Sequence, residues 1–275
     1  MDRRLPGFLA VLLAAAVLAP PAALAEGIEI PGSGNPEYAL ARLAEAFNAR
    51  QAEHRVSIPA SIGTAGALRE VESGAASLAR VGRPLSAEET ARGLMYVPLG
   101  RDPVVFAAGA DVTVRSITSE EVLAIYSGRL TDWKELGGRP GPIRAIGREV
   151  SDASRRAIGQ HLKPFVEMEF PGNIKVVHLD PQLVELLDRY PTSLGFLNVS
   201  GLKACKSKIV LLAFDGVEPT VESMGAGRYP LWLEFGLIYS TSNALTPAGK
   251  AFLAFINSSV GRDVLRGLGV QPVAA

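Results

Sequence analysis

The chain of 275 residues carries 28 Lys and Arg against 28 Asp and Glu, so its formal net charge is zero. This balance argues against a general nucleic-acid-binding or anionic-membrane-binding surface, because both would show a basic excess. A net charge of zero does not argue against a local positive pocket. The length is enough for one large domain or for two lobes with separate cores.

The first 25 residues contain the three regions of a secretion signal in the correct order. Arg3 and Arg4 form a short basic start, residues 8–18 are an unbroken apolar run, and Ala23-Leu24-Ala25 provides a small-x-small cleavage pattern. The apolar run is shorter than the roughly 20 residues that a membrane-spanning helix needs. We therefore expect a signal peptide over residues 1–25, cleavage after Ala25 and a soluble exported protein.

Short β-branched segments alternate with longer amphipathic segments along the rest of the chain. The periodicity predicts strands at residues 28–30, 56–58, 104–108, 143–146, 193–199 and 232–240, and helices at residues 36–50, 66–73, 118–126, 151–162 and from Thr246 onward. This alternation predicts an α/β protein with mainly parallel sheets.

Residues suited to helix ends mark several of the predicted boundaries. Asn35 is suited to cap the helix at residues 36–50, with Pro36 in its first position. Residues 86–89 and 118–121 each have the pattern of a capping box, in which a hydroxyl and a glutamate satisfy the first N–H groups of a helix.

Three junctions share one design: a strand, a loop of small polar residues and then a helix start. They lie at residues 32–35 (Gly-Ser-Gly-Asn), 63–66 (Gly-Thr-Ala-Gly) and 148–154 (Arg-Glu-Val-Ser-Asp-Ala-Ser). A helix start exposes unpaired N–H donors, and small residues let an anion approach the backbone. If the junctions met at one cleft, they would coordinate an oxyanion, and Arg148 would add a bidentate contact. Each loop taken alone is also consistent with an ordinary helix cap.

Motifs of nucleotide sites and hydrolases do not occur in the sequence. After Gly32 and Gly34, the third glycine of a dinucleotide fingerprint would fall at position 37, which is glutamate. The sequence contains no P-loop, no G-x-S-x-G elbow and no H-E-x-x-H pattern. We therefore expect a protein that is not an enzyme and that uses no cofactor.

The histidines and the single cysteine do not form a recognisable metal or nucleophile site. His54, His161 and His178 are scattered along the chain, and a structural or surface role is expected for each. Cys205 cannot form an internal disulfide, and we expect it to be a buried structural thiol. The sequence therefore predicts no metal site.

Many segments, in order, carry a family resemblance. They are residues 32–34 and 62–66 as two anion loops, 82–85 (Gly-Arg-Pro-Leu), 117–121, 126–128, 131–138 with a W-x-x-L-G-G turn, 193–196, 215–220, 228–231 and 267–272. Taken together, these segments resemble the phosphate-binding-protein (ABC transporter substrate-binding) branch of the type 2 periplasmic binding protein superfamily. The resemblance covers essentially the whole chain after residue 25.

That resemblance implies a two-lobed α/β fold of the type 2 periplasmic binding proteins, with the ligand cleft between the lobes. Residues 26–105 and 232–275 would form lobe 1 and residues 106–231 lobe 2, with crossings near Val105 and Trp232. It also implies an extracytoplasmic solute-binding protein for a small inorganic oxyanion, phosphate first, delivered to an ABC permease in the inner membrane. We expect a periplasmic monomer that binds no nucleic acid.

The loops and the resemblance together give the expected ligand-binding residues. They are Ser33, Gly34, Asn35, Thr64, Ala65, Arg83, Arg148, Asp152, Ala153 and Ser154. The resemblance implies that Thr64 and Ser154 supply hydroxyl donors and that Arg148 pairs with the anion.

Four positions depart from the family's pattern. Pro36 stands where the family usually has threonine, and Gly82 stands where a serine or a proton-accepting carboxylate usually lies. Asp152 replaces a serine and Ala153 a glycine. Asp152 either faces the ligand, where it would repel a dianion, or turns to solvent as a helix cap. Arg83 either points into the cleft or pairs with a surface carboxylate.

Two other functions stay open at this point. The altered loops would also suit a diverged binding or interaction module of the same fold that is not dedicated to phosphate transport. A gene neighbourhood without permease or ATPase genes would favour that alternative. A hydrolase on the same scaffold would need an assembled nucleophile and base, and the sequence offers none.

Overall fold

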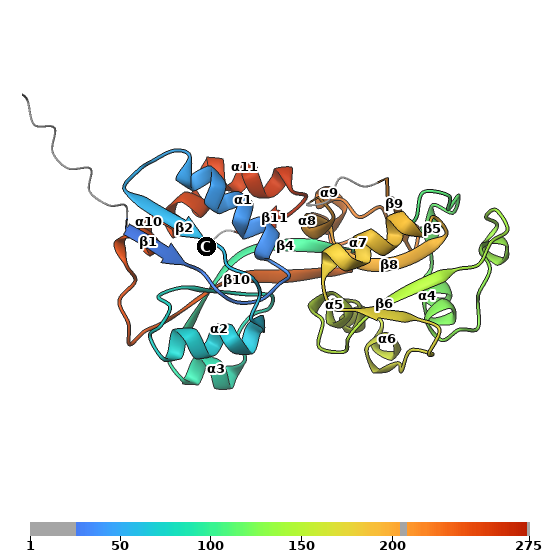
Figure 1. The fold of residues 1–275 in the computed structure, drawn as a ribbon, viewed down its shortest axis with the longest axis horizontal. Helices are drawn as coiled ribbons and strands as arrows, with labels where there is room; N and C mark the ends of the chain where they lie inside the picture. Colours follow the sequence, from blue (N-terminus) through green and yellow to red (C-terminus); the bar gives the residue numbers. More distant parts are fainter. Residues whose placement is uncertain (1–25, 204–207, 274–275) are drawn as a thin grey trace, which may run out of the picture.

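The computed structural model describes residues 26–203 and 208–273 of the chain. The expected signal peptide and Cys205 lie outside these residues. The described chain forms two lobes connected by long strands (Figure 1). Within the described ranges, no helix has both the length and the apolar character needed to span a bilayer.

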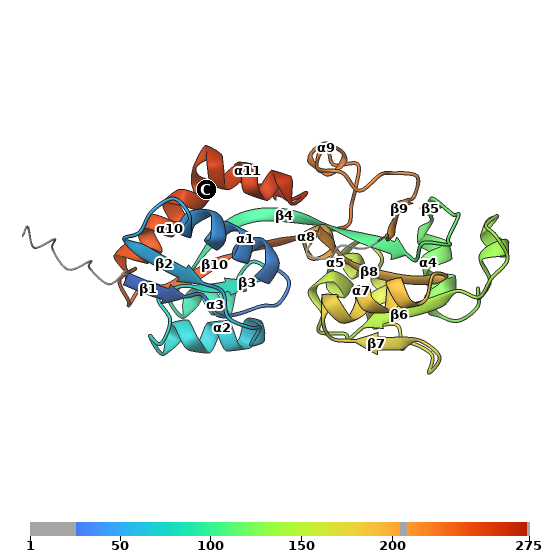
Figure 2. The same cartoon turned by 45° about the horizontal axis from the view of Figure 1, so that its top comes forward.

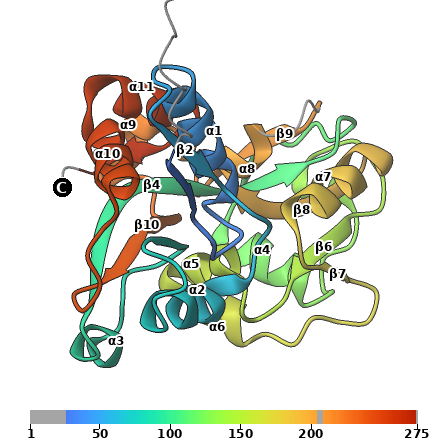
Figure 3. The ribbon, with the colours of Figure 1, turned by 60° about the vertical axis from the view of Figure 1, so that its left-hand side comes forward.

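The first lobe combines the beginning and the end of the described chain. Its elements are β1 (Glu26–Glu29), α1 (Glu37–Asn48), β2 (His54–Ser57), α2 (Gly63–Glu72), β3 (Ala79–Val81), α3 (Ala87–Ala91), α10 (Pro247–Asn257), α11 (Ser259–Gly267) and β11 (Gln271–Pro272). Strands β1 and β2 pair in parallel. Helices α1, α10 and α11 lie on one side of this lobe, and α2 and α3 lie on the other (Figure 3).

The second lobe is built from the middle of the chain. Its elements are β5 (Ser116–Ile117), α4 (Ser119–Tyr126), a 3₁₀ helix η1 (Trp133–Leu136), β6 (Arg144–Arg148), α5 (Ala153–His161), α6 (Lys163–Glu167), β7 (Lys175–Val177), α7 (Asp180–Arg189), β8 (Ser193–Asn198), α8 (Val199–Lys203), β9 (Val210–Phe214) and α9 (Val221–Gly225). Strand β6 pairs in parallel with β7 and β8.

A fully buried aromatic cluster holds the second lobe together. The Phe106 ring lies 5.8 to 6.4 Å, centroid to centroid, from the rings of Tyr126, Phe165, Phe196 and Phe214. These rings come from strands of the sheet and from α4 and α6, so their packing fixes the helices onto the sheet. Large buried aromatic side chains of this kind dominate the energetics of a core.

Two strands cross between the lobes, β4 (Leu94–Ala108) and β10 (Trp232–Ser240) (Figure 2). Strand β4 pairs with β10 up to Pro103, and from Val104 onward it pairs with β8. This change of partner lies beside the expected crossings at Val105 and Trp232, although the proposed lobe boundaries stay a prediction. The expectation of mainly parallel sheets is wrong, because every described neighbour of β4 and β10 runs antiparallel to them.

Most of the predicted helix caps are present, and one is wrong. The capping boxes that begin at Ser86 and Thr118 are both present, and Thr246 caps α10. The expected cap by Asn35 is wrong. Helix α1 begins at Glu37 without a side-chain cap, and Asn35 bonds to the second lobe instead.

Candidate functional site: the cleft between the lobes

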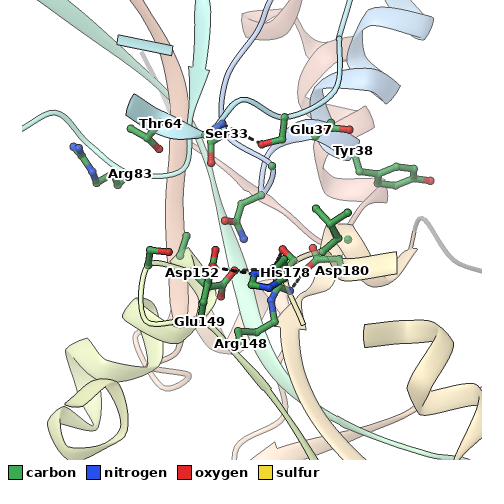
Figure 4. Close-up of a pocket in the computed structure, with 18 of the residues that line it drawn as sticks. Ser33, Glu37, Tyr38, Thr64, Arg83, Arg148, Glu149, Asp152, His178 and Asp180 are labelled. Atoms are coloured by element: carbon green, nitrogen blue, oxygen red, sulfur yellow. Dashed lines mark hydrogen bonds and ion pairs between the residues drawn. The ribbon is translucent and has the colours of Figure 1, made fainter. Parts of the chain in front are cut away.

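A cavity of about 730 Å³ lies between the two lobes (Figure 4). Its walls contain every residue expected to bind ligand except Ser154, which is fully buried at the start of α5. The lining residues are Ser33, Gly34, Asn35, Glu37, Tyr38, Ala41, Ile58, Ser61, Gly63, Thr64, Ala65, Arg83, Arg148, Glu149, Ser151, Asp152, Ala153, Arg156, His178, Leu179, Asp180, Pro181 and Gly201. The three predicted loops therefore meet at one cavity, and whether they bind an anion there stays a prediction.

Asn35 connects the two lobes across this cavity. Its side-chain amide donates to Ser154 Oγ at 3.4 Å and to Asn198 Oδ1 at 3.5 Å. Both acceptors belong to the second lobe and are fully buried. The lobes are therefore in polar contact beside the cavity.

Buried Arg80 holds the first loop in place. Its guanidinium donates to the carbonyl oxygens of Ser33 (2.9 Å) and Pro59 (2.7 Å), to Ile30 O, and to the Glu37 carboxylate (3.0 Å). The side chain is 0% exposed, and burial lowers its pKa although Glu37 opposes the shift. Arg80 thus ties the first loop, the segment before α2 and the start of α1 together. An arginine inside an otherwise apolar strand was the sequence signal for this role, and it was missed.

The second loop is the first turn of α2 rather than a segment before it. Helix α2 begins at Gly63, not at the predicted Gly66. Gly63 has φ +71°, a left-handed conformation that glycine adopts without strain. Thr64 and Ala65 follow in the first turn, where backbone N–H groups have no partner within the helix. The loop therefore presents donors and the Thr64 hydroxyl at the cavity (Figure 4).

Arg148 in the third loop is bound by two carboxylates. Its guanidinium lies 2.8 Å from Asp152 Oδ2, contacts Asp180 Oδ1 and donates to the His178 carbonyl at 3.0 Å. Arg148 is 4% exposed and Asp152 is 8% exposed. Asp180 opens α7, 32 positions after Arg148, and the parallel pairing of β6 with β7 brings it there.

Asp152 combines parts of both expected roles. It caps α5 by accepting from the Arg155 N–H at 2.9 Å, so the capping role is confirmed. The expectation that a capping Asp152 turns to solvent is wrong, because the carboxylate is buried against Arg148 and lines the cavity.

Arg148, Asp152 and Asp180 lie together in one wall of the cavity, and their charges shift one another's pKa values. Burial raises the pKa of Asp152, with the Asp180 charge adding to the shift and Arg148 opposing it. Burial acts to lower the pKa of Arg148, but the charges of Asp152 and Asp180 outweigh it and the pKa rises. When both carboxylates are ionised, the three groups carry a net charge of −1. In that state the wall would repel an anion that carries no proton.

The Arg83 guanidinium is paired with a carboxylate away from the centre of the cleft. Its guanidinium forms two 2.7 Å bonds with the Glu89 carboxylate and donates to the Pro84 carbonyl at 2.8 Å. These bonds hold the pKa of Glu89 at about 2. Arg83 is among the residues that line the cavity, but its guanidinium points away from the cavity centre (Figure 4). The structure thus shows the carboxylate-paired alternative, and a ligand contact by Arg83 stays a prediction.

Arg156 is a cavity residue that was not predicted. It lies on α5, one turn after Asp152, and its side chain is exposed at the cavity. Among the residues that the structure describes, its guanidinium has no hydrogen-bond or ion-pair partner. Burial and then the positive charge of Arg83 lower its pKa, while Asp152 acts in the opposite direction. Helical spacing from Asp152 was the available sequence signal.

Two further carboxylates at the cavity, those of Glu149 and Glu37, are paired. Glu149 Oε2 lies 2.9 Å from His178 Nδ1, and Glu37 is held by Arg80. Within the described part of the chain, no three His, Cys, Asp or Glu side chains are grouped so that they could hold a metal ion.

A buried polar network connects the cavity with a crossing strand. Asp102 of β4 is 1% exposed and accepts from Asn198 Nδ2 (2.7 Å), from the Ser200 N–H (3.2 Å) and from the Ser200 hydroxyl. Burial raises the pKa of Asp102 to about 6, with these bonds opposing the shift. Asn198 also accepts from Asn35, so the network reaches the first lobe.

A family model described as a PBP superfamily domain matches residues 19–260. The chain belongs to the PBP superfamily. The match covers the second lobe, both crossing strands and the first lobe as far as the beginning of α11, and it confirms the two-lobed α/β architecture.

This PBP-superfamily chain is similar to proteins that are named as phosphate-binding proteins. It is 26% identical to phosphate-binding protein PstS of Borreliella burgdorferi over 194 residues, 68% of this chain and 69% of that protein. It is 26% identical to PstS of Bacillus subtilis over 168 residues, 61% of this chain and 54% of that protein. A Clostridium perfringens structure, described as a phosphate ABC transporter substrate-binding protein with bound phosphate, is 25% identical with a TM-score of 0.78. That alignment covers 90% of this chain and 100% of the other.

Proposed function

We propose that this PBP-superfamily chain is an extracytoplasmic solute-binding protein for a small inorganic oxyanion, phosphate first, which it delivers to an ABC permease. The observation that carries the proposal is the meeting of three helix-start loops, from two lobes, at one cavity. Relatives named as phosphate-binding proteins support the choice of phosphate.

Binding would rest mainly on backbone donors and hydroxyl groups. The first turn of α2 offers N–H groups and the Thr64 hydroxyl, and Ser33 lies at the cavity from the first loop. Such donors stabilise an oxyanion without a large local charge. Asn35 already contacts the second lobe, and further closure of the lobes would trap the ligand. The closed form is then the form that a permease would recognise.

Asp152 would select the protonation state of the ligand. It would accept a hydrogen bond from a protonated anion and repel a fully ionised one. In this role it replaces, from the other lobe, the acceptor that is missing at Gly82. Hydrogen phosphate carries such a proton near neutral pH and sulfate does not, so this wall would favour phosphate.

The proposal extends to the setting of the protein. We expect export to the periplasm with cleavage after Ala25, action as a monomer, and binding of neither nucleic acid nor a cofactor. A binding role without catalysis agrees with the names of the relatives, which are called binding proteins.

Calorimetry with phosphate, sulfate and molybdate tests the proposal. We expect phosphate binding that Thr64→Ala weakens and that Thr90→Ala, a matched change on the exposed face of α3, leaves unchanged. Failure of the folded protein to bind any of the three anions would refute the proposal.

A second function is favoured by the state of Arg148. Two carboxylates already bind this arginine, which suits a diverged binding or interaction module that is not dedicated to phosphate transport. A folded protein without oxyanion affinity, encoded away from permease and ATPase genes, would support this alternative.

A further inference from the structure

Asp102 lies at the crossing between the lobes. It pairs with Leu233 of β10 two residues before β4 changes its partner to β8. Asp102 is 1% exposed, and within residues 26–203 and 208–273 no arginine, lysine or histidine forms an ion pair with it. Burying a carboxylate without a cation is costly unless hydrogen bonds replace its water. The role of Asp102 therefore lies in the hydrogen bonds that it accepts.

These bonds fix the orientation of the Asn198 amide. Asn198 Nδ2 donates to Asp102 Oδ2 at 2.7 Å and to Ser200 Oγ at 2.9 Å, and the Ser200 hydroxyl in turn donates to Asp102. An amide nitrogen carries two N–H groups, so both are used, and only the oxygen of Asn198 is left for the first lobe. That oxygen accepts from Asn35 Nδ2 at 3.5 Å. The Asp102 carboxylate thus sets which end of the Asn198 amide faces Asn35.

Helix α8, which directly follows Asn198, also contacts the first lobe. The Tyr38 hydroxyl of α1 donates to the Lys203 carbonyl at 3.3 Å, and Lys203 Nζ donates to the Gly267 carbonyl of α11 at 2.9 Å. Helix α8 lies next to the crossing strand β4, which is the pivot of any closure of the lobes (Figure 1). A contact beside a pivot changes less during closure than one at the open edge of a cleft. The region around Asn198 therefore stays in contact with the first lobe when the lobes close on a ligand.

We propose that Asp102 is a positioning residue for ligand binding, which turns the Asn198 oxygen toward Asn35 and so holds the first loop against the second lobe. The inference rests on the proposed solute-binding function, because Asn35 belongs to a loop that lines the cavity. Asn35 Nδ2 also reaches Ser154 Oγ, at 3.4 Å, where the third loop enters α5. Asp102 is not among the residues that line the cavity, so it acts through Asn198 and Asn35.

The first test is Asp102→Asn, which keeps the size of the side chain but replaces one acceptor oxygen by a donor group. When the remaining oxygen accepts from the Ser200 N–H, the new amide nitrogen faces Asn198 Nδ2. Asn198 must then turn over, which brings its nitrogen against the Asn35 nitrogen, and two donors meet. We expect phosphate affinity to fall at least about tenfold by calorimetry at pH 8, where Asp102 is ionised in the wild type. Hydrogen exchange at residues 33–38 of the ligand-free protein should become faster.

A double variant with Asp102→Asn and Asn198→Asp provides the rescue. The new asparagine can donate to the new carboxylate, whose other oxygen can accept from Asn35. We expect an affinity within about threefold of wild type, and the wild-type rate of hydrogen exchange at residues 33–38. Two merely structural defects would add up, and the double variant would then bind no better than Asp102→Asn. Asp111→Asn, at an exposed position, is the matched control and should change neither quantity.

Each outcome separates this inference from the proposed function. Unchanged phosphate affinity or unchanged hydrogen exchange in Asp102→Asn would overturn the inference, as would a double variant that binds as weakly as the single one. If Asp102→Asn does not fold, the double variant decides, and its failure to fold would also overturn the inference. A wild-type protein that binds no oxyanion would overturn the proposed function. Hydrogen exchange of the ligand-free proteins would still show in that case whether Asp102 positions Asn35.

Discussion

The Asp152 carboxylate lies 2.8 Å from the Arg148 guanidinium, in a wall of the cleft where both side chains are buried. Asp180 contacts the same guanidinium from the start of α7. Arg148 was expected from the sequence to pair with the anion, as the one positive side chain in the three loops. Because two carboxylates surround it, its contribution to binding depends on their protonation and on that of the ligand.

Replacing Asp152 by serine should widen the range of anions that bind. Serine keeps a hydroxyl that can cap α5 and removes one negative charge from the cavity wall. We expect sulfate affinity to rise at least tenfold and phosphate affinity to rise less, since sulfate has no proton to offer a carboxylate near pH 7. Calorimetry with both anions measures the difference. Exposed Asp111→Ser serves as the control, and unchanged sulfate affinity would show that the carboxylate does not face the ligand.

Replacing Arg148 by methionine should destabilise the fold. The change leaves the Asp152 and Asp180 carboxylates without their shared cation, and loss of one partner from a buried ion pair typically costs about 3–5 kcal/mol. We expect a loss of that size in the free energy of unfolding, measured by urea denaturation at pH 7. Adding Asp152→Ser to the same chain should recover at least about 1 kcal/mol, because the two residues are coupled. A loss below about 1 kcal/mol in the single variant would contradict this account.

The parts of the fold that could be predicted are those set by signals within a few neighbouring residues. Hydroxyls in capping boxes, as at Ser86 and Thr118, act over a few residues. The sequence therefore shows them directly, and strand β10 was predicted with its observed bounds. The direction of β4 relative to its neighbours was not predictable in this way, because it depends on pairing with strands far along the chain.

The partners of the site residues were predictable only in part. Loop composition and the family resemblance together indicated Ser33, Thr64 and Arg148 as residues of one site, and they line one cavity. That Arg148 contacts Asp180 follows from the register of β6 on β7, which no local pattern reveals. The contact of Asn35 with the second lobe likewise depends on how the lobes are placed relative to each other. Long-range register and lobe placement therefore set which charges in the site are free.

Replacing Arg80 by methionine should disturb the first loop without changing any cavity-lining residue. Methionine is long and apolar, but it cannot donate to the carbonyls of Ser33 and Pro59. Buried carbonyls left without partners cost about 1–3 kcal/mol each, so we expect a clear loss of stability. We also expect at least tenfold weaker anion binding, with faster hydrogen exchange at residues 30–36. Exposed Arg69→Met on α2 is the control, and unchanged affinity in a folded Arg80→Met protein would rule out a positioning role.

Asp102 should make the stability of the protein depend on pH between about 4 and 6. Burial raises its pKa from 3.8 to about 6 in the folded state, so in this window the folded protein binds more protons than the unfolded chain. The stability contributed by protonated Asp102 is thus fully present below about pH 4 and is lost as pH rises through about 6. This rise of the Asp102 pKa from 3.8 to about 6 corresponds to a total change on the order of 3 kcal/mol in the free energy of unfolding.

The comparison that isolates this contribution is wild type against Asp102→Asn. Asparagine resembles the protonated carboxyl and does not titrate, so the stability of wild type relative to the variant should fall by about 2 kcal/mol from pH 4 to pH 7. Urea denaturation at pH 4, 5, 6 and 7 measures this difference. Glu89 has a pKa lowered to about 2, so its stabilising effect is lost mainly below this range and is common to both proteins. A difference that stays constant across the four pH values would mean that Asp102 is ionised throughout, with its charge stabilised by Asn198 and Ser200.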